Sequence, residues 1–198
     1  AGLVFGMTPG ESTKLAGVQN GGVMLGMVIV AIAGSAIGGR RLGSMRFWAV
    51  SGCLASGVAF IGLAIAGNFA DVWPLRANVF FLGLANGAFA VAAIGSMMGL
   101  ANTGGENREG TRMGLWGASQ AIAFGISGFL GTVAVDVARM VFGQPVLAYS
   151  SVFAGEAILF VLSAFIAWKV APSAALGSRK TGATGKLEEN NYGIQPAE

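Results

Sequence analysis

The chain has 198 residues, of which 54% are hydrophobic and 11% are charged, and its formal net charge is +3. A soluble domain carries about 25% charged residues, so this composition excludes an ordinary soluble fold. The apolar residues form long continuous runs, whereas an outer-membrane barrel alternates apolar and polar residues in short segments. The sequence therefore predicts an all-α membrane protein, a polytopic bundle of about five transmembrane helices.

Several functional classes are excluded by residues that the chain lacks. It contains no histidine and a single cysteine, Cys53, which excludes His-based catalysis, a metal cluster and a disulfide framework. Lys and Arg flank the apolar runs and form no basic stripe, so no nucleic-acid partner is predicted. The sequence has no nucleophile elbow, phosphate-binding loop or carboxylate pair, so we expect that the chain is not an enzyme.

The apolar runs and their flanking residues predict the elements in chain order. A lead segment over residues 1–12 is followed by a transmembrane helical domain over residues 13–170. Thr8 and Glu11 have the spacing of a capping box, which predicts a helix start at this point. The approximate helix ranges are 8–38, 47–67, 74–101, 112–141 and 146–170. Residues 171–198 are rich in small and charged side chains, which predicts a disordered tail.

Basic residues set the expected orientation, because Lys and Arg concentrate in cytoplasmic loops. One side of the predicted bundle carries Arg40, Arg41, Arg46, Arg108, Arg112, Lys169, Arg179, Lys180 and Lys186. That side is predicted to be cytoplasmic, which places the lead segment outside and the C-terminus in the cytoplasm. We therefore expect a multi-pass protein of a bacterial inner membrane.

Glu156 is a carboxyl group inside the last predicted helix. It lies about 10 residues, or roughly 15 Å, from the start of that helix. An acid at this depth is either a proton or ligand site, or a protonated group that hydrogen-bonds a neighbouring helix. Asn86 reaches a similar depth and would meet Glu156 if the two helices touch.

Two further amides, Gln19 and Gln120, lie inside apolar helices. Each is either a ligand contact or an interhelical hydrogen bond, and the second interpretation is favoured because such bonds are common. Asp136 and Arg139 are spaced i,i+3, which predicts a local surface ion pair. Glycines at small-residue spacing predict close helix packing. The glycines chosen for this role are Gly22, Gly26, Gly83, Gly87, Gly114, Gly117 and Gly128.

Five stretches of the chain resemble one known family. They are the runs Gly6–Leu15, Gly22–Gly26, Leu82–Val91 and Met97–Ala101, and the run from Gly110 to Gly131 that contains MGLWGASQA. Together they resemble the PucC-like proteins, the bacteriochlorophyll delivery branch of the major facilitator superfamily. The resemblance extends from about Gly6 to Val170 and implies the last five of twelve helices, in the C-terminal half of a major facilitator fold.

The resemblance implies an assembly factor for the purple-bacterial light-harvesting antenna in the intracytoplasmic membrane. Such a factor would bind or deliver bacteriochlorophyll and stabilise antenna subunits, with antenna polypeptides or the reaction-centre complex as partners in the lipid bilayer. Gln120, Asn86, Glu156, a backbone carbonyl and a water molecule are then candidates for an axial ligand of the pigment magnesium. Two alternatives remain open: half of a proton-coupled solute transporter with Glu156 as its proton site, and a structural subunit of a photosynthetic complex.

Overall fold

A computed structural model describes residues 2–34, 44–69, 72–101 and 109–189 of the chain. Every regular element in these ranges is a helix, and five helices are long and apolar enough to cross a membrane. The predicted all-α membrane bundle is therefore confirmed. The helices are α1 (Gly2–Phe5), α2 (Pro9–Gly34), α3 (Met45–Ala66), α4 (Leu75–Ala101), α5 (Glu109–Phe142) and α6 (Pro145–Glu189).

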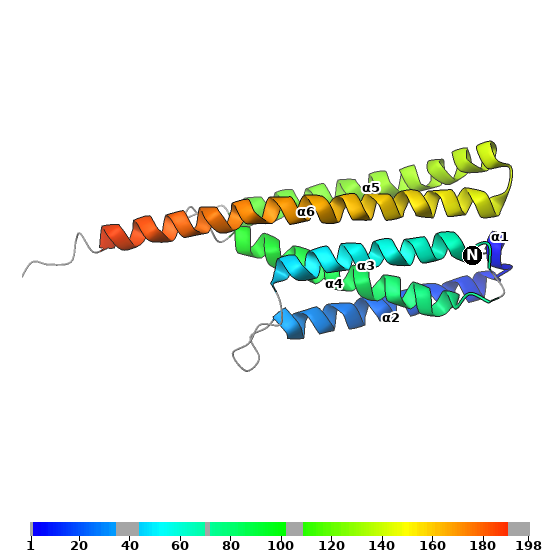
Figure 1. Cartoon of the computed structure of the whole chain (residues 1–198), viewed down its shortest axis with the longest axis horizontal. Coiled ribbons are helices and arrows are strands. Elements are labelled where there is room, and N and C mark those ends of the chain that lie inside the picture. The colour runs from blue at the N-terminus through cyan, green and yellow to red at the C-terminus, as the bar shows by residue number, and fades with distance from the viewer. Residues whose placement is uncertain (1, 35–43, 70–71, 102–108, 190–198) are drawn as a thin grey trace, which may run out of the picture.

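The last helix is longer than the sequence predicts. Helix α6 continues to Glu189 and extends beyond the rest of the bundle (Figure 1), whereas a disordered tail was expected from residue 171. An existing helix adds one backbone hydrogen bond with each further residue, which lets α6 continue even though Pro172 and the glycines of this segment disfavour a helix. Residues 35–38 of the first predicted helix and residues 190–198 of the predicted tail lie outside the described ranges.

Helix α2 begins with the capping box that the sequence predicts. The Thr8 backbone N–H donates to Glu11 Oε2 at 2.9 Å, and the Glu11 N–H donates to Thr8 Oγ1 at 3.3 Å. These two bonds satisfy donors that a helix N-terminus otherwise leaves without partners.

The turn between α5 and α6 depends on one glycine. Gly143 has φ +65, a left-handed conformation that side chains with a Cβ disfavour. Its N–H donates to the Arg139 carbonyl at 3.0 Å, which closes the end of α5. Pro145 then begins α6 with a backbone angle already suited to a helix.

The packed core consists of α2, α3, α4 and α6. Helix α4 packs against both α2 and α3, and α3 also packs against α6 (Figure 1). Small side chains dominate the buried positions, so the backbones approach closely. The buried alanines of these four helices are Ala33, Ala59, Ala66, Ala85, Ala88, Ala92, Ala148, Ala157 and Ala164.

The contact between α2 and α4 is made by four glycines. Gly22 and Gly26 of α2 face the α4 backbone, while Gly83 and Gly87 of α4 face the α2 backbone. A Cβ at Gly26 would overlap the Leu84 carbonyl group, whose carbon lies only 2.9 Å away. Since backbone atoms cannot move aside as a flexible side chain can, none of the four positions has room for a methyl group at this helix separation. We call this contact the glycine interlock.

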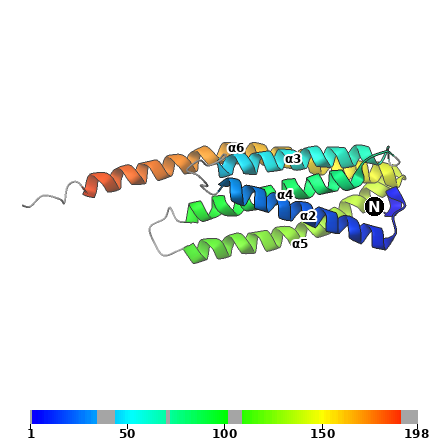
Figure 2. The same cartoon turned by 90° about the horizontal axis from the view of Figure 1, so that it is seen from below.

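Helix α5 stands apart from this core. Figure 2 shows it diverging from α6 as the two helices run away from their shared turn. Every side chain from residue 117 to residue 130 is exposed. Among the side chains of α5 that the structure describes, only that of Ala138, near the turn, is buried. The middle of this apolar helix therefore presents its whole circumference to its surroundings.

Replacing Gly26 by alanine is expected to lower the unfolding midpoint of the purified protein, because the added methyl group would overlap the Leu84 backbone. Overpacking of this kind costs about 1–3 kcal/mol. Scanning fluorimetry in mild detergent measures the shift. Gly17→Ala on the same helix is the matched control, since no atom lies within 4 Å of a Cβ built there. Equal midpoints for the two variants would contradict the interlock.

Candidate functional site

Asn86 is engaged inside the core. Its side-chain oxygen accepts a hydrogen bond of 2.9 Å from the hydroxyl of Ser56 on α3, which is 0% exposed. From the sequence, Asn86 was expected to meet Glu156 if their two helices touched. Asn86 is bonded to Ser56 instead, since α4 packs mainly on α2 and α3. Ser56 was not singled out from the sequence, although its place among small residues in mid-helix marks a buried face.

Glu156 is half-buried on α6. Phe153 and Phe160, on the same helix, pack against the Phe60 ring of α3 with centroid distances of 6.1 and 5.3 Å. No described residue forms a hydrogen bond or an ion pair with the Glu156 carboxyl group. This placement is compatible with a proton site, a ligand site or an interhelical bond to a group outside the described ranges.

The remaining two amides lie on other helices. Gln120 is exposed in the first half of α5, and Gln19 is half-buried on α2, where its backbone carbonyl faces Gly83. The four polar candidates thus occupy four helices, and the structure brings none of their side chains into hydrogen-bond contact with another. Over the described ranges, no group of three or more His, Cys, Asp or Glu residues could hold a metal ion.

The predicted packing glycines fall into two sets. Four of them form the interlock between α2 and α4 described above. The other three, Gly114, Gly117 and Gly128, have no atom within 4 Å of a Cβ built on them. Their packing role stays a prediction that needs a partner from outside the described residues.

Arg46, at the start of α3, binds α6 through Trp168. Its Nη2 donates a hydrogen bond to the Trp168 backbone carbonyl, and its guanidinium carbon lies 4.4 Å from the centroid of the Trp168 ring. In an uninterrupted helix this carbonyl accepts from the N–H four residues later. That residue is Pro172, which has no N–H. Arg46 therefore supplies the donor that α6 lacks at this point.

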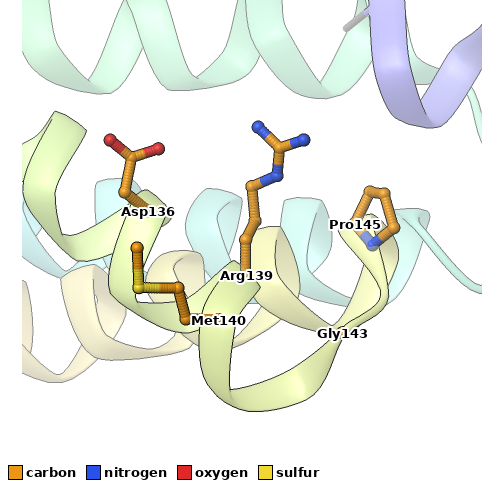
Figure 3. Close-up of a pocket in the computed structure, with 5 residues that line it drawn as sticks. All are labelled: Asp136, Arg139, Met140, Gly143 and Pro145. Carbon is orange, nitrogen blue, oxygen red and sulfur yellow. The ribbon is translucent and has the colours of Figure 1, made fainter.

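The opposite end of the bundle has a shallow pocket of about 400 Å³ beside the α5–α6 turn. Asp136 and Arg139 project into it from α5, close to Met140 and Pro145 (Figure 3). The predicted ion pair between Asp136 and Arg139 is wrong, since none is formed between these two described side chains. Both are exposed, and an exposed pair gains too little energy to fix its geometry.

A comparison with protein families identifies the chain. A family model described as "PUCC protein" matches residues 1–175. The chain belongs to this family. It is 48% identical over 167 residues to the "Bacteriochlorophyll synthase 44.5 kDa chain" of Rhodobacter capsulatus, and the match covers 84% of this chain and 38% of that protein. No solved structure matches the chain.

This PUCC family chain also carries an apolar groove between α3 and α6. The groove has a volume of about 380 Å³, and all of its lining side chains are aliphatic. Alanines form part of its lining, at Ala64, Ala154 and Ala157. Such a surface suits hydrocarbon chains, and the lipid bilayer supplies them.

A double-mutant cycle tests the link between Arg46 and Pro172. We expect Arg46→Met to lower the unfolding midpoint, because hydrogen bonds from charged groups contribute about 1.5–3 kcal/mol. The loss should be smaller in a Pro172→Ala background, where an N–H can reach the Trp168 carbonyl.

Thermal unfolding of the four proteins in one detergent measures the coupling. Arg76→Met is the control, since Arg76 is exposed at the other end of the bundle and should show no coupling to Pro172→Ala. Purely additive effects of Arg46→Met and Pro172→Ala would contradict the proposed replacement of the missing donor.

Proposed function

We propose that this chain assists the assembly of bacteriochlorophyll-containing light-harvesting complexes in the bacterial inner membrane, with its C-terminus in the cytoplasm. The observation that carries the proposal is the family match over residues 1–175, together with a relative whose name refers to bacteriochlorophyll. The chain spans about two-fifths of that relative, as the match covers 38% of its length.

Helix α5 is the surface that we assign to a client helix. Its side chains from residue 117 to residue 130 are all exposed, and Gly114, Gly117 and Gly128 have open space around them. Small residues let a second transmembrane helix approach closely, and such contacts drive association in lipid. An antenna polypeptide, which crosses the membrane as a helix, fits this role.

Gln120 gives the same helix a polar contact. An amide exposed at membrane depth is unfavourable in hydrocarbon unless it finds a partner. A client helix can supply a hydrogen bond, and bacteriochlorophyll can supply its magnesium, which takes an axial oxygen ligand. Asn86 is less suited to this task because its side chain is already bonded to Ser56. Glu156 is a second candidate, and the neighbouring Phe153 and Phe160 rings already pack against Phe60.

We propose binding and hand-over rather than catalysis. The relative is named a synthase chain, yet the polar candidates of this chain lie on separate helices. A catalytic step needs a nucleophile, base or acid held within hydrogen-bond reach of its partner. The described side chains are therefore better suited to binding and orienting a client than to a catalytic step.

Deleting the gene from a photosynthetic bacterium that carries it is expected to reduce near-infrared antenna absorbance per cell, and the wild-type gene should restore it. Gln120→Leu should restore less, because it removes the exposed amide while keeping the side chain apolar and of similar size. Absorbance spectra of intact membranes measure the effect, with the amount of each variant checked by immunoblotting.

Gln144→Leu serves as the control, since this exposed glutamine lies in the turn between α5 and α6. The proposal fails if the deletion strain keeps normal antenna absorbance. Accumulation of a pigment precursor in the deletion strain would instead favour a catalytic role and contradict the hand-over mechanism.

A further inference from the structure

Two cations lie where hydrophobic helices end at one end of the bundle. Arg46 is the second residue of the candidate membrane span Met45–Ala66, and Lys169 is the last residue of the span Pro145–Lys169. Both spans pack side by side as α3 and α6. The two side chains are therefore expected at the depth of the lipid headgroups, just outside the hydrocarbon core. We call Arg46, Trp168 and Lys169 the basic-end cluster.

Aromatic rings hold both charges in place. The Arg46 guanidinium lies 4.4 Å from the Trp168 ring centroid, and the Lys169 Nζ lies 4.7 Å from the Phe165 ring centroid. Arg46 is fixed further by its hydrogen bond to the Trp168 carbonyl. Trp168 is itself 59% exposed, as is typical of a tryptophan that anchors a helix at a membrane interface.

The charge of this cluster is not balanced by any carboxyl group whose side chain the structure describes. Those carboxyl groups belong to Glu11 near the start of α2, Asp136 near the end of α5, and Glu156 in the middle of the α6 span Pro145–Lys169. Glu11 and Asp136 are at the opposite end of the bundle. Arg46 Nε is buried and has no hydrogen-bond partner among the described residues.

We infer that the basic-end cluster binds the phosphate headgroup of an anionic phospholipid. Guanidinium and ammonium groups are the side chains that bind phosphate oxygens best, through charge-assisted hydrogen bonds. A zwitterionic lipid carries its own cation beside the phosphate, so it gains less from this site. The lipid headgroup would join the ends of α3 and α6 at the membrane surface, where Pro172 interrupts the hydrogen bonding of α6. This inference does not depend on the proposed antenna function.

The test uses the full chain purified in mild detergent and native mass spectrometry with added phosphatidylglycerol or phosphatidylcholine. The wild-type protein is expected to retain phosphatidylglycerol in preference to phosphatidylcholine. Lys169→Gln should weaken phosphatidylglycerol binding about fivefold, the effect of one basic residue at a membrane surface. Arg76→Gln, which removes an exposed cation at the opposite end of the bundle, should leave the binding unchanged.

Arg46→Gln should weaken phosphatidylglycerol binding as well. If the Arg46 variant does not fold, the binding measured for Lys169→Gln alone tests the inference. Lys169 is exposed and has a single ring contact in the described structure, so its loss leaves the packing intact. Equal retention of the two lipids, or equal binding by Lys169→Gln and Arg76→Gln, overturns the inference. Displacement of phosphatidylglycerol by millimolar inorganic phosphate would assign the site to free phosphate and overturn the lipid assignment.

Discussion

The glycine interlock between α2 and α4 is the contact on which the rest of the structure depends. In a bilayer the hydrophobic effect does not drive helices together, so close packing and interhelical hydrogen bonds must do so. Gly22 and Gly26 meet the α4 backbone, and Gly83 and Gly87 meet the α2 backbone. Helix α3 then packs on α4 through the Ser56–Asn86 hydrogen bond, and α6 packs on α3 through small side chains and stacked rings.

This order of packing separates structural from functional surfaces. The side chain of Asn86 is already bonded to Ser56 inside the core, so Asn86 is better explained as part of the scaffold than as a ligand. Helix α5 contributes little to that core and keeps Gln120 and its open glycines for other molecules. The Arg46–Trp168 contact joins the start of α3 to α6 at the point where α6 leaves its membrane span.

The spans and the capping box could be predicted from the sequence, because hydropathy and the spacing of Thr8 and Glu11 act locally. The glycine pairs were visible too, but their partners were not, since spacing alone does not say which helices face each other. The same limit hid Ser56 as the partner of Asn86. Pro172 marks a carbonyl that lacks a donor, yet only the fold shows that Arg46 supplies one. The spacing of Asp136 and Arg139 was misleading because solvent competes for exposed charges.

Hydrogen–deuterium exchange of the purified protein in lipid nanodiscs tests the central claim most directly. The amides of α2 and α4 around the interlock should exchange slowly, because they open only when the core opens. The amides of α5 between residues 117 and 130 should exchange faster, since no described helix packs around them. Equal protection of α5 and α4, or faster exchange in α4, would contradict a core built on the glycine interlock with α5 left free.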